Sequence, residues 1–191
     1  ALANADPDTD VIRFEPSLFE TASRTITLRQ DHLELTGNVI VYGPGADLLS
    51  VSANHKLLAG GNGVFTVAAG IDVTLYGLTI ADGNGNHGIK NAGNLRVDHV
   101  VVSDNAVIED FGGGISNSGT LELTNSTIVG NFAAAGGGLY NESEATIENS
   151  TFHFNHATGD GGAIQSVNGS VVIANSTISS NSADAHGGGI A

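Results

Sequence analysis

Apolar and polar residues alternate in short segments that recur along the second half of the chain. In each segment two apolar positions lie two residues apart, as Leu121 and Leu123 do, with a mostly polar position between them. A period of two is typical of half-buried β-strands. Four such segments superpose, and each ends in Asn: NLRVDHVVVSDN (94–105), TLELTNSTIVGN (120–131), EATIENSTFHFN (144–155) and SVVIANSTISSN (170–181).

A glycine-rich anchor follows each segment after a variable stretch of small or acidic residues. The anchors read GGGIS (112–116), GGGLY (136–140), GGAIQ (161–165) and GGGIA (187–191). Their aliphatic residues and one earlier equivalent lie 26, 24, 25 and 26 residues apart: Ile89, Ile115, Leu139, Ile164 and Ile190. The glycines allow the chain to turn a corner with positive φ. One repeat therefore holds about three short strands and no helix, as a coil of a solenoid does.

This strand-built repeat of about 25 residues predicts an all-β fold, a right-handed single-stranded parallel β-helix of about seven coils. Residues that recur once per coil stack directly above one another at about 4.8 Å. We expect two Asn columns to hydrogen-bond along the stack in this way. They are Asn105, Asn131, Asn155 and Asn181 in the first column, and Asn125, Asn149 and Asn175 in the second. A propeller is excluded because each blade needs about 40 residues and four antiparallel strands.

The first half of the chain follows the same plan less regularly. We predict a single β-helix domain over residues 1–191, with irregular first coils over 1–63 and regular repeats over 64–191. The chain ends on GGGIA, which begins a further repeat, so we expect it to be a fragment of a longer protein. An uncapped coil at the end of a β-helix can pair with another chain.

Charge is unevenly distributed along this chain, whose formal net charge is −14. All six cations precede residue 97: Arg13, Arg24, Arg29, Lys56, Lys90 and Arg96. Such an acidic surface repels nucleic acid and anionic membranes, because phosphate binding needs clustered Lys and Arg. We expect no direct membrane insertion, since no apolar run approaches the roughly 20 residues of a membrane span. The absence of Cys excludes a disulfide framework.

Many parallel β-helices act on polysaccharides, so a carbohydrate-active enzyme is a serious alternative. A lyase of this kind needs calcium-binding carboxylates beside an Arg or Lys base, and no cation follows Arg96. An inverting glycosidase needs paired carboxylates, and no Asp-Asp dipeptide occurs. A site that combines Lys56 or Arg96 with Asp98 and His99 stays open, although we expect Asp98 and His99 to lie in a turn.

Calcium is the strongest ion candidate, and no other cofactor is expected. Asp82, Asn84 and Asn86 place oxygen ligands at alternate positions, as calcium loops do, and Asp6–Asp10 has the same spacing. The loop does not complete an EF-hand, because Gly93 stands where the bidentate Glu belongs. His153 and His156 are three residues apart, and we expect them to be exposed loop residues rather than metal ligands.

The second Asn column coincides with three Asn-Ser-Thr sequences, at Asn125, Asn149 and Asn175. Each satisfies the acceptor pattern for glycosylation. A position that recurs once per coil does so for structural reasons, and an Asn within a stack is poorly accessible. We therefore interpret all three as structural residues.

The repeats resemble those of large bacterial surface proteins with GGGI-N…TLTLTNSTISGN motifs, which include the polymorphic outer-membrane proteins and autotransporter-like passengers. The match covers residues 64–191, and Phe152–Asn155 is a single FxxN motif of the kind found in the chlamydial members. The opening ALANADPDTDVIRFEPSLF, followed by TITL, resembles the segment that follows a CSLREA motif in secreted β-helix proteins. The resemblance implies secretion, display on the bacterial cell surface, and an adhesive or structural role.

We therefore expect a non-catalytic, extracellular or cell-surface segment that acts as a stalk, adhesin or assembly module. Its expected partners are a glycan or protein on a host or neighbouring cell, or a second copy bound end to end. A carbohydrate-active enzyme and a self-associating filament subunit are the alternatives. A groove in which two or three carboxylates and a cation converge within hydrogen-bond reach would overturn the non-catalytic interpretation.

Overall fold

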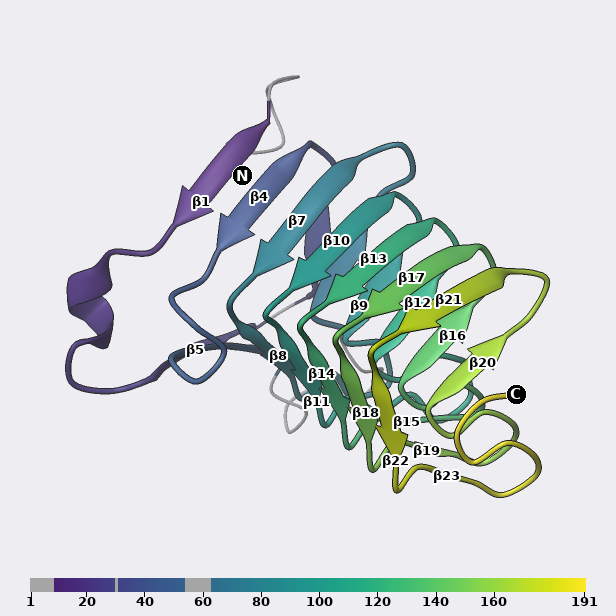
Figure 1. Cartoon of the computed structure of the whole chain (residues 1–191). Helices are drawn as coiled ribbons and strands as arrows, with labels where there is room; N and C mark the ends of the chain where they lie inside the picture. Colours follow the sequence, from purple (N-terminus) through teal and green to yellow (C-terminus); the bar gives the residue numbers. More distant parts are fainter. Residues whose placement is uncertain (1–8, 30, 54–62) are drawn as a thin grey trace.

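The chain folds as a parallel β-solenoid in which strands from successive coils stack side by side (Figure 1). The structure is a computed structural model that describes residues 9–29, 31–53 and 63–191. Its described part contains one 3-10 turn, η1 (Pro16–Phe19), and otherwise strands and turns. No helix in these residues is long and apolar enough to cross a membrane.

Three long sheets and one short sheet run along the solenoid. The first, sheet A, contains β1 (Asp10–Arg13), β4 (Val39–Tyr42), β7 (Asp72–Tyr76), β10 (Asn94–Asp98), β13 (Thr120–Thr124), β17 (Glu144–Glu148) and β21 (Ser170–Ala174). Sheet B contains β2 (Arg24–Thr27), β5 (Leu49–Ser52), β8 (Thr79–Ala81), β11 (Val101–Ser103), β14 (Thr127–Val129), β18 (Thr151–His153) and β22 (Thr177–Ser179). Sheets A and B each stack seven strands, which define about six turns of about 26 residues, one turn fewer than the expected seven coils of about 25 residues.

The other two sheets close the coil. Sheet C contains β3 (Leu33–Leu35), β6 (Phe65–Val67), β9 (Ile89–Asn91), β12 (Ile115–Asn117), β16 (Leu139–Asn141) and β20 (Ile164–Ser166). Sheet D contains β15 (Phe132–Ala133), β19 (His156–Ala157) and β23 (Ser182–Ala183). Every pairing between these strands is parallel, as the sequence repeat predicts.

Equivalent apolar residues of successive coils stack inside the solenoid. In sheet A, Leu95 pairs with Leu121, and Leu121 pairs with Ala145. All three are buried, and they belong to one continuous core cluster that extends from Phe19 to Ile164. Burial of each large aliphatic side chain stabilises the fold by about 1.5–3 kcal/mol. The period-two pattern therefore determines which side of each strand faces the core.

The stacking reaches further towards the N-terminus than the regular repeat in the sequence does. Strand β1 pairs with β4, and β4 pairs with β7, with Asp10 opposite Val39 and Val39 opposite Val73. Between β1 and β2 the chain leaves the stack in a loop that contains η1 (Figure 1). The irregularity of the first coils is therefore an irregularity of loop length, and their strands keep the register.

Candidate functional site

The first predicted Asn column is a continuous line of hydrogen bonds. The Nδ2 of Asn105 donates to the Oδ1 of Asn131, at 3.0 Å, and the same bond joins Asn131 to Asn155 at 2.9 Å and Asn155 to Asn181 at 3.0 Å. Each Oδ1 also accepts the backbone N–H of the Asn in the coil before it. Because Asn105, Asn131 and Asn155 are buried, the column satisfies polar groups that water cannot reach.

The second predicted column is wrong in its choice of residue. Asn125, Asn149 and Asn175 are exposed at a corner with φ of 50°, 51° and 50°, and no hydrogen bond joins them among the described residues. The left-handed backbone, which Asn tolerates better than most residues, directs these side chains outward. Our interpretation of the Asn-Ser-Thr sequences as inaccessible is wrong for the same reason.

The serines that follow these residues form the column instead. The hydroxyl of Ser126 accepts the N–H of Val100, that of Ser150 accepts the N–H of Ser126, and that of Ser176 accepts the N–H of Ser150. A further column of Asn91, Asn117 and Asn141 is buried, with Nδ2 to Oδ1 distances of 2.7 Å. The sequence contains a signal for this column, because each of the three Asn residues follows an aliphatic anchor residue by two positions.

Chemistry-bearing side chains gather where sheet A ends and the chain turns towards sheet B. Arg13, Tyr42, Tyr76 and Asp98 occupy equivalent strand ends, in register from coil to coil. The Arg13 guanidinium lies 4.4 Å from the Tyr42 ring centroid, and the Tyr42 and Tyr76 ring centroids are 5.8 Å apart. The Tyr76 ring in turn lies 5.2 Å from that of His99. We name this set of Arg13, Tyr42, Tyr76 and His99 the corner column.

The corner column was not predicted, although the sequence contains a signal for it. Both VIVYG (39–43) and VTLYG (73–77) place Tyr at a strand end directly before a corner glycine. The later coils have Asp98, Thr124 and Glu148 at the same register position. A comparison of the repeats therefore does not find the two tyrosines, because they occur only in the irregular first coils.

Two open hollows lie along the corner column. The larger, of about 790 Å³, lies between the loop that contains η1 and the turn that follows β4, and Arg13, Tyr42 and Tyr76 line it. The smaller, of about 540 Å³, has Tyr76, His99 and Asn125 in its lining. Pro44 and Tyr76 line both hollows, so the two adjoin along the corner, and we name them together the corner groove.

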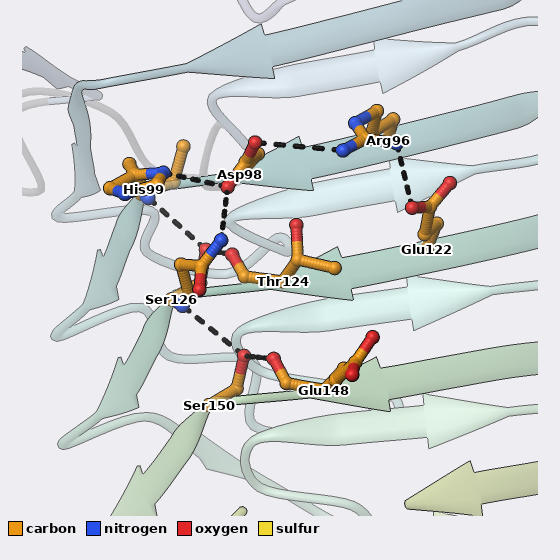
Figure 2. A network of polar contacts seen from close by, with 10 residues as sticks. Arg96, Asp98, His99, Glu122, Thr124, Ser126, Glu148 and Ser150 are labelled. Atoms are coloured by element: carbon orange, nitrogen blue, oxygen red, sulfur yellow. Dashed lines mark hydrogen bonds and ion pairs between the residues drawn. The ribbon is translucent and has the colours of Figure 1, made fainter. Parts of the chain in front are cut away.

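A polar cluster adjoins the groove on β10 and β13 (Figure 2). The Arg96 guanidinium lies 2.7 Å from the Glu122 carboxylate and 3.6 Å from that of Asp98. The Oδ1 of Asp98 is also 2.7 Å from the Nδ1 of His99 and accepts a hydrogen bond of 2.9 Å from Asn125. Partial burial alone would raise the pKa of Asp98, but the hydrogen bonds from Asn125 and His99 outweigh it and lower that pKa.

This cluster joins three residues that the sequence offered as a candidate early-coil site. Arg96, Asp98 and His99 lie together, His99 at a corner with φ of 55°, while Lys56 lies outside the described residues. A general acid needs a carboxyl group that is protonated near neutral pH, and the lowered pKa of Asp98 has the opposite effect. Arg96 is paired with both carboxylates, so its charge is neutralised within the protein.

The predicted calcium ligands lie at the turn after β8. The Oδ2 of Asp82 accepts a hydrogen bond of 2.7 Å from the Ser52 hydroxyl, and the Oδ1 of Asn86 accepts one from the N–H of His87. Asn84 forms a parallel bridge with Ala106. Within the described residues, no three His, Cys, Asp or Glu side chains lie close enough to hold a metal ion. Asp6 and Asp8 lie outside these residues, and Asp10 begins β1.

The paired histidines lie on different sheets. His153 ends β18 and its Nδ1 contacts Ser179, whereas His156 begins β19 and its ring stacks on Phe132 at 5.4 Å. Both are half-buried rather than fully exposed, contrary to our expectation of exposed loop residues. Each histidine contacts a residue of a neighbouring coil, as side chains on the surface of a stacked sheet do.

His87 is the one described histidine in the core, with 2 % of its surface exposed. Its Nδ1 lies 2.9 Å from the Gly112 carbonyl, so this nitrogen carries the hydrogen, and its Nε2 lies 3.6 Å from Asp110. Burial lowers its pKa below the ordinary value of 6.5, although Gly112 and Asp110 oppose that shift and Lys90 adds to it.

We expect His87 to make the protein less stable in mild acid. Because the folded pKa is depressed, the unfolded chain binds a proton that the native state does not, and stability falls as the pH drops below 6.5. His87→Gln should reduce this dependence, measured as the free energy of unfolding in urea from pH 8 to pH 5. His99→Gln, at an exposed histidine, is the control, and an equal effect of both substitutions would contradict the prediction.

Phe154 is an exposed aromatic residue in a strained conformation. Its φ is 53°, and 62 % of its surface is exposed. Gly130 occupies the equivalent corner one coil earlier, with φ of 67°. We expect Phe154→Gly to raise the free energy of unfolding by about 0.5–1 kcal/mol, because relief of the left-handed strain exceeds the entropy cost of glycine. Phe154→Ala removes the ring without relieving that strain, so equal stabilities of the two variants in urea denaturation would refute the explanation.

Comparison with known proteins agrees with this architecture. Residues 25–191, well over half of the chain, match the family model described as a right-handed beta helix region. No curated protein and no solved structure matches the chain. The matched region includes most of the corner groove and the whole polar cluster. The chain belongs to the family of right-handed parallel β-helix proteins.

Proposed function

We propose that this chain is a non-catalytic segment of a bacterial surface protein, in which the β-helix acts as a stalk and binds through its surface as an adhesin. The polar cluster on β10 and β13 is the observation that carries the proposal. It is closed on itself, since Arg96 pairs with Glu122 and Asp98, and Asp98 is also bonded by Asn125. The lowered pKa of Asp98 makes it a poor acid and a weak base.

The sequence supports an extracellular location. The repeats resemble those of bacterial surface proteins, and the opening segment resembles the one that follows a CSLREA motif. The net charge of −14 is suited to a solvent-exposed surface that does not adhere to nucleic acid. Continuous hydrogen-bonded columns along the axis give a rod its stiffness, which a stalk requires.

A carbohydrate-active enzyme is the second candidate, and one observation favours it. Glu122 and Asp98 lie 2.7 and 3.6 Å from the Arg96 guanidinium beside the groove. Only Glu122 is within hydrogen-bond distance, so the cluster approaches, without reaching, the arrangement that we expected to overturn the non-catalytic interpretation. Inverting and retaining glycosidases both work with two carboxyl groups that flank the bond to be cleaved. An exchange of partners between Arg96 and a bound sugar would free both carboxylates.

Turnover decides between the two candidates. We expect the protein to release no reducing ends and no unsaturated products from a panel of neutral and acidic polysaccharides. Asp98→Asn and Glu122→Gln are the matched variants, because each removes one carboxylate and keeps the side-chain shape. Release of product by the parent protein, abolished in both variants, would establish the enzyme and exclude the non-catalytic role.

Self-association is the remaining candidate for a partner. The last coil exposes part of its interior side, since Ile173 is 36 % exposed whereas its equivalent Ile147 is fully buried. A second copy that stacks on this coil would cover that surface and form a filament. Light scattering at high protein concentration tests this, and a monodisperse monomer would rule out the filament.

A further inference from the structure

The groove along the corner column has features of a built binding surface that the proposed function leaves unspecified. Arg13, Tyr42, Tyr76 and the Asp98–His99 corner belong to four consecutive coils. Coils are about 4.8 Å apart, so the column extends for about 14 Å along the axis. An extended ligand can therefore meet a flat side chain at each step, which is a guanidinium, a phenol ring or an imidazole.

Both walls of the larger hollow are held in place before any ligand binds. On one side, Phe19 is buried and packs edge-on to Phe14, and the Nε of Arg24 donates to the Leu18 carbonyl at 2.9 Å. This wall is therefore held by the packing of two rings and by one hydrogen bond across the 3-10 turn η1. A preformed surface loses little conformational entropy when it binds, which favours affinity.

The opposite wall is the turn that follows β4. Its Gly43 and Gly45 donate backbone hydrogen bonds to the carbonyls of Tyr76 and Gly77, at 2.8 and 2.9 Å. The hydroxyl of Thr79 donates to the carbonyl of Ala46 at 2.7 Å. This turn is therefore joined to the next coil along its length, and it keeps Pro44 in the lining of both hollows.

The lining combines apolar ring surface with hydrogen-bonding groups of both kinds. Tyr76, whose side chain has an apolar ring and a polar hydroxyl, lines both hollows. Asn125 and Thr127 supply donors and acceptors, and Asp47 supplies acceptors. Sugar rings present the complementary surface, with C–H faces that pack on aromatic rings and hydroxyls that donate and accept.

Charge narrows the class of ligand to an uncharged chain. The charged lining residues are three carboxylates, Glu15, Glu20 and Asp47, and one guanidinium, that of Arg13, so the groove repels an anionic polymer. A cationic peptide would meet Arg13, which already lies over the face of Tyr42. We propose that the corner groove binds an extended neutral glycan, with Tyr76 at its centre; this rests on the proposed adhesive function and names its ligand.

Tyrosine emission provides a direct measurement of binding. The chain has three Tyr and no Trp, and two of the three tyrosines line the groove. In Tyr140→Phe all the tyrosine emission comes from the groove. We expect titration of this variant with cellohexaose, xylohexaose, maltohexaose and mannohexaose to give a saturable change with at least one of them.

Substitutions then locate the site. Tyr76→Ala should weaken binding of that hexaose at least tenfold, measured by calorimetry, whereas Tyr140→Ala, on sheet C, should leave it unchanged. Asn125→Gly keeps the left-handed corner and removes the amide, so it tests the site even where Tyr76→Ala fails to fold; we expect a several-fold loss.

Three outcomes overturn the proposal: no neutral hexaose binds, both groove variants bind as the parent does, or polygalacturonate or a polylysine peptide binds in place of the hexaoses. Turnover of the bound glycan would be a failure of the proposed non-catalytic function and not of the proposed binding site. It would contradict the non-catalytic function and leave the assignment of the groove intact, because product release is measured separately from affinity.

Discussion

Replacement of Asn131 by Ala should lower the free energy of unfolding by about 3 kcal/mol or more. Asn131 lies in the middle of the buried Asn column and is 1 % exposed. Its Oδ1 accepts the Nδ2 and the backbone N–H of Asn105, and its Nδ2 donates to Asn155 and to the carbonyls of Val102 and Val129. Truncation leaves these groups without partners where water cannot solvate them, at about 1–3 kcal/mol for each orphaned group.

Asn181 provides the matched control because it belongs to the same column. Its Oδ1 accepts from Asn155 in the same way, but Asn181 is only half-buried in the last coil. Water can replace part of what Asn181→Ala removes, so we expect a loss of about 1 kcal/mol. Urea denaturation of both variants measures the difference. Equal losses of unfolding free energy in the two variants would show that burial does not determine how much each Asn of the column contributes to stability.

The fold could be predicted because one sequence signal was repeated many times. The anchor aliphatics Ile115, Leu139 and Ile164 recur at nearly equal spacing and do pair in sheet C. Period-two alternation placed Leu121 and Leu123 in the core, where both are buried. Each repeat is a separate observation of the same physical constraint, so errors in single coils do not accumulate.

The choice between columns could not be made from recurrence alone. Asn125 and Asn131 both recur in at least three repeats of the sequence, yet one is exposed and the other is buried. The difference lies in backbone dihedral angles, since Asn125 has φ of 50° and turns its amide outward. Asn is favoured both as a left-handed corner residue and as an amide in a ladder, so its recurrence in the repeat does not distinguish the two roles.

Of the candidate site, Arg96, Asp98 and His99 could be proposed from the sequence, but the corner column and the partner Glu122 could not, because they depend on residues that do not recur. Tyr42 and Tyr76 occupy only the first coils, and the Arg96–Glu122 ion pair joins residues whose equivalents in other coils are uncharged, such as Thr74 and Thr146. The recurring residues specify the scaffold, whereas the residues of the candidate site are those that differ between coils. The register between coils determines which of these non-recurring side chains become neighbours, and it can be read only once the strands are aligned.

Gly137→Ala should prevent close stacking of the coils and lower the free energy of unfolding by at least about 3 kcal/mol. A Cβ atom at this position would lie 2.3 Å from the carbonyl oxygen of His156 and 2.6 Å from that of Gly162. Both obstacles are backbone atoms of the next coil, whose N–H and carbonyl groups are already engaged, as in the bond from Gly137 to Gly161. The coil must therefore move as a unit, which breaks neighbouring hydrogen bonds.

Gly188 tests this explanation, because it occupies the equivalent anchor position in the last coil. There the nearest atom to a new Cβ, the carbonyl oxygen of Asn181, lies at 3.0 Å, so the alanine fits with a small adjustment. We expect Gly188→Ala to change the free energy of unfolding by less than about 1 kcal/mol, since neither glycine has a positive φ that alanine would strain. Comparable destabilisation of the two variants in urea would mean that the anchor glycines serve backbone flexibility, and not the close approach of successive coils.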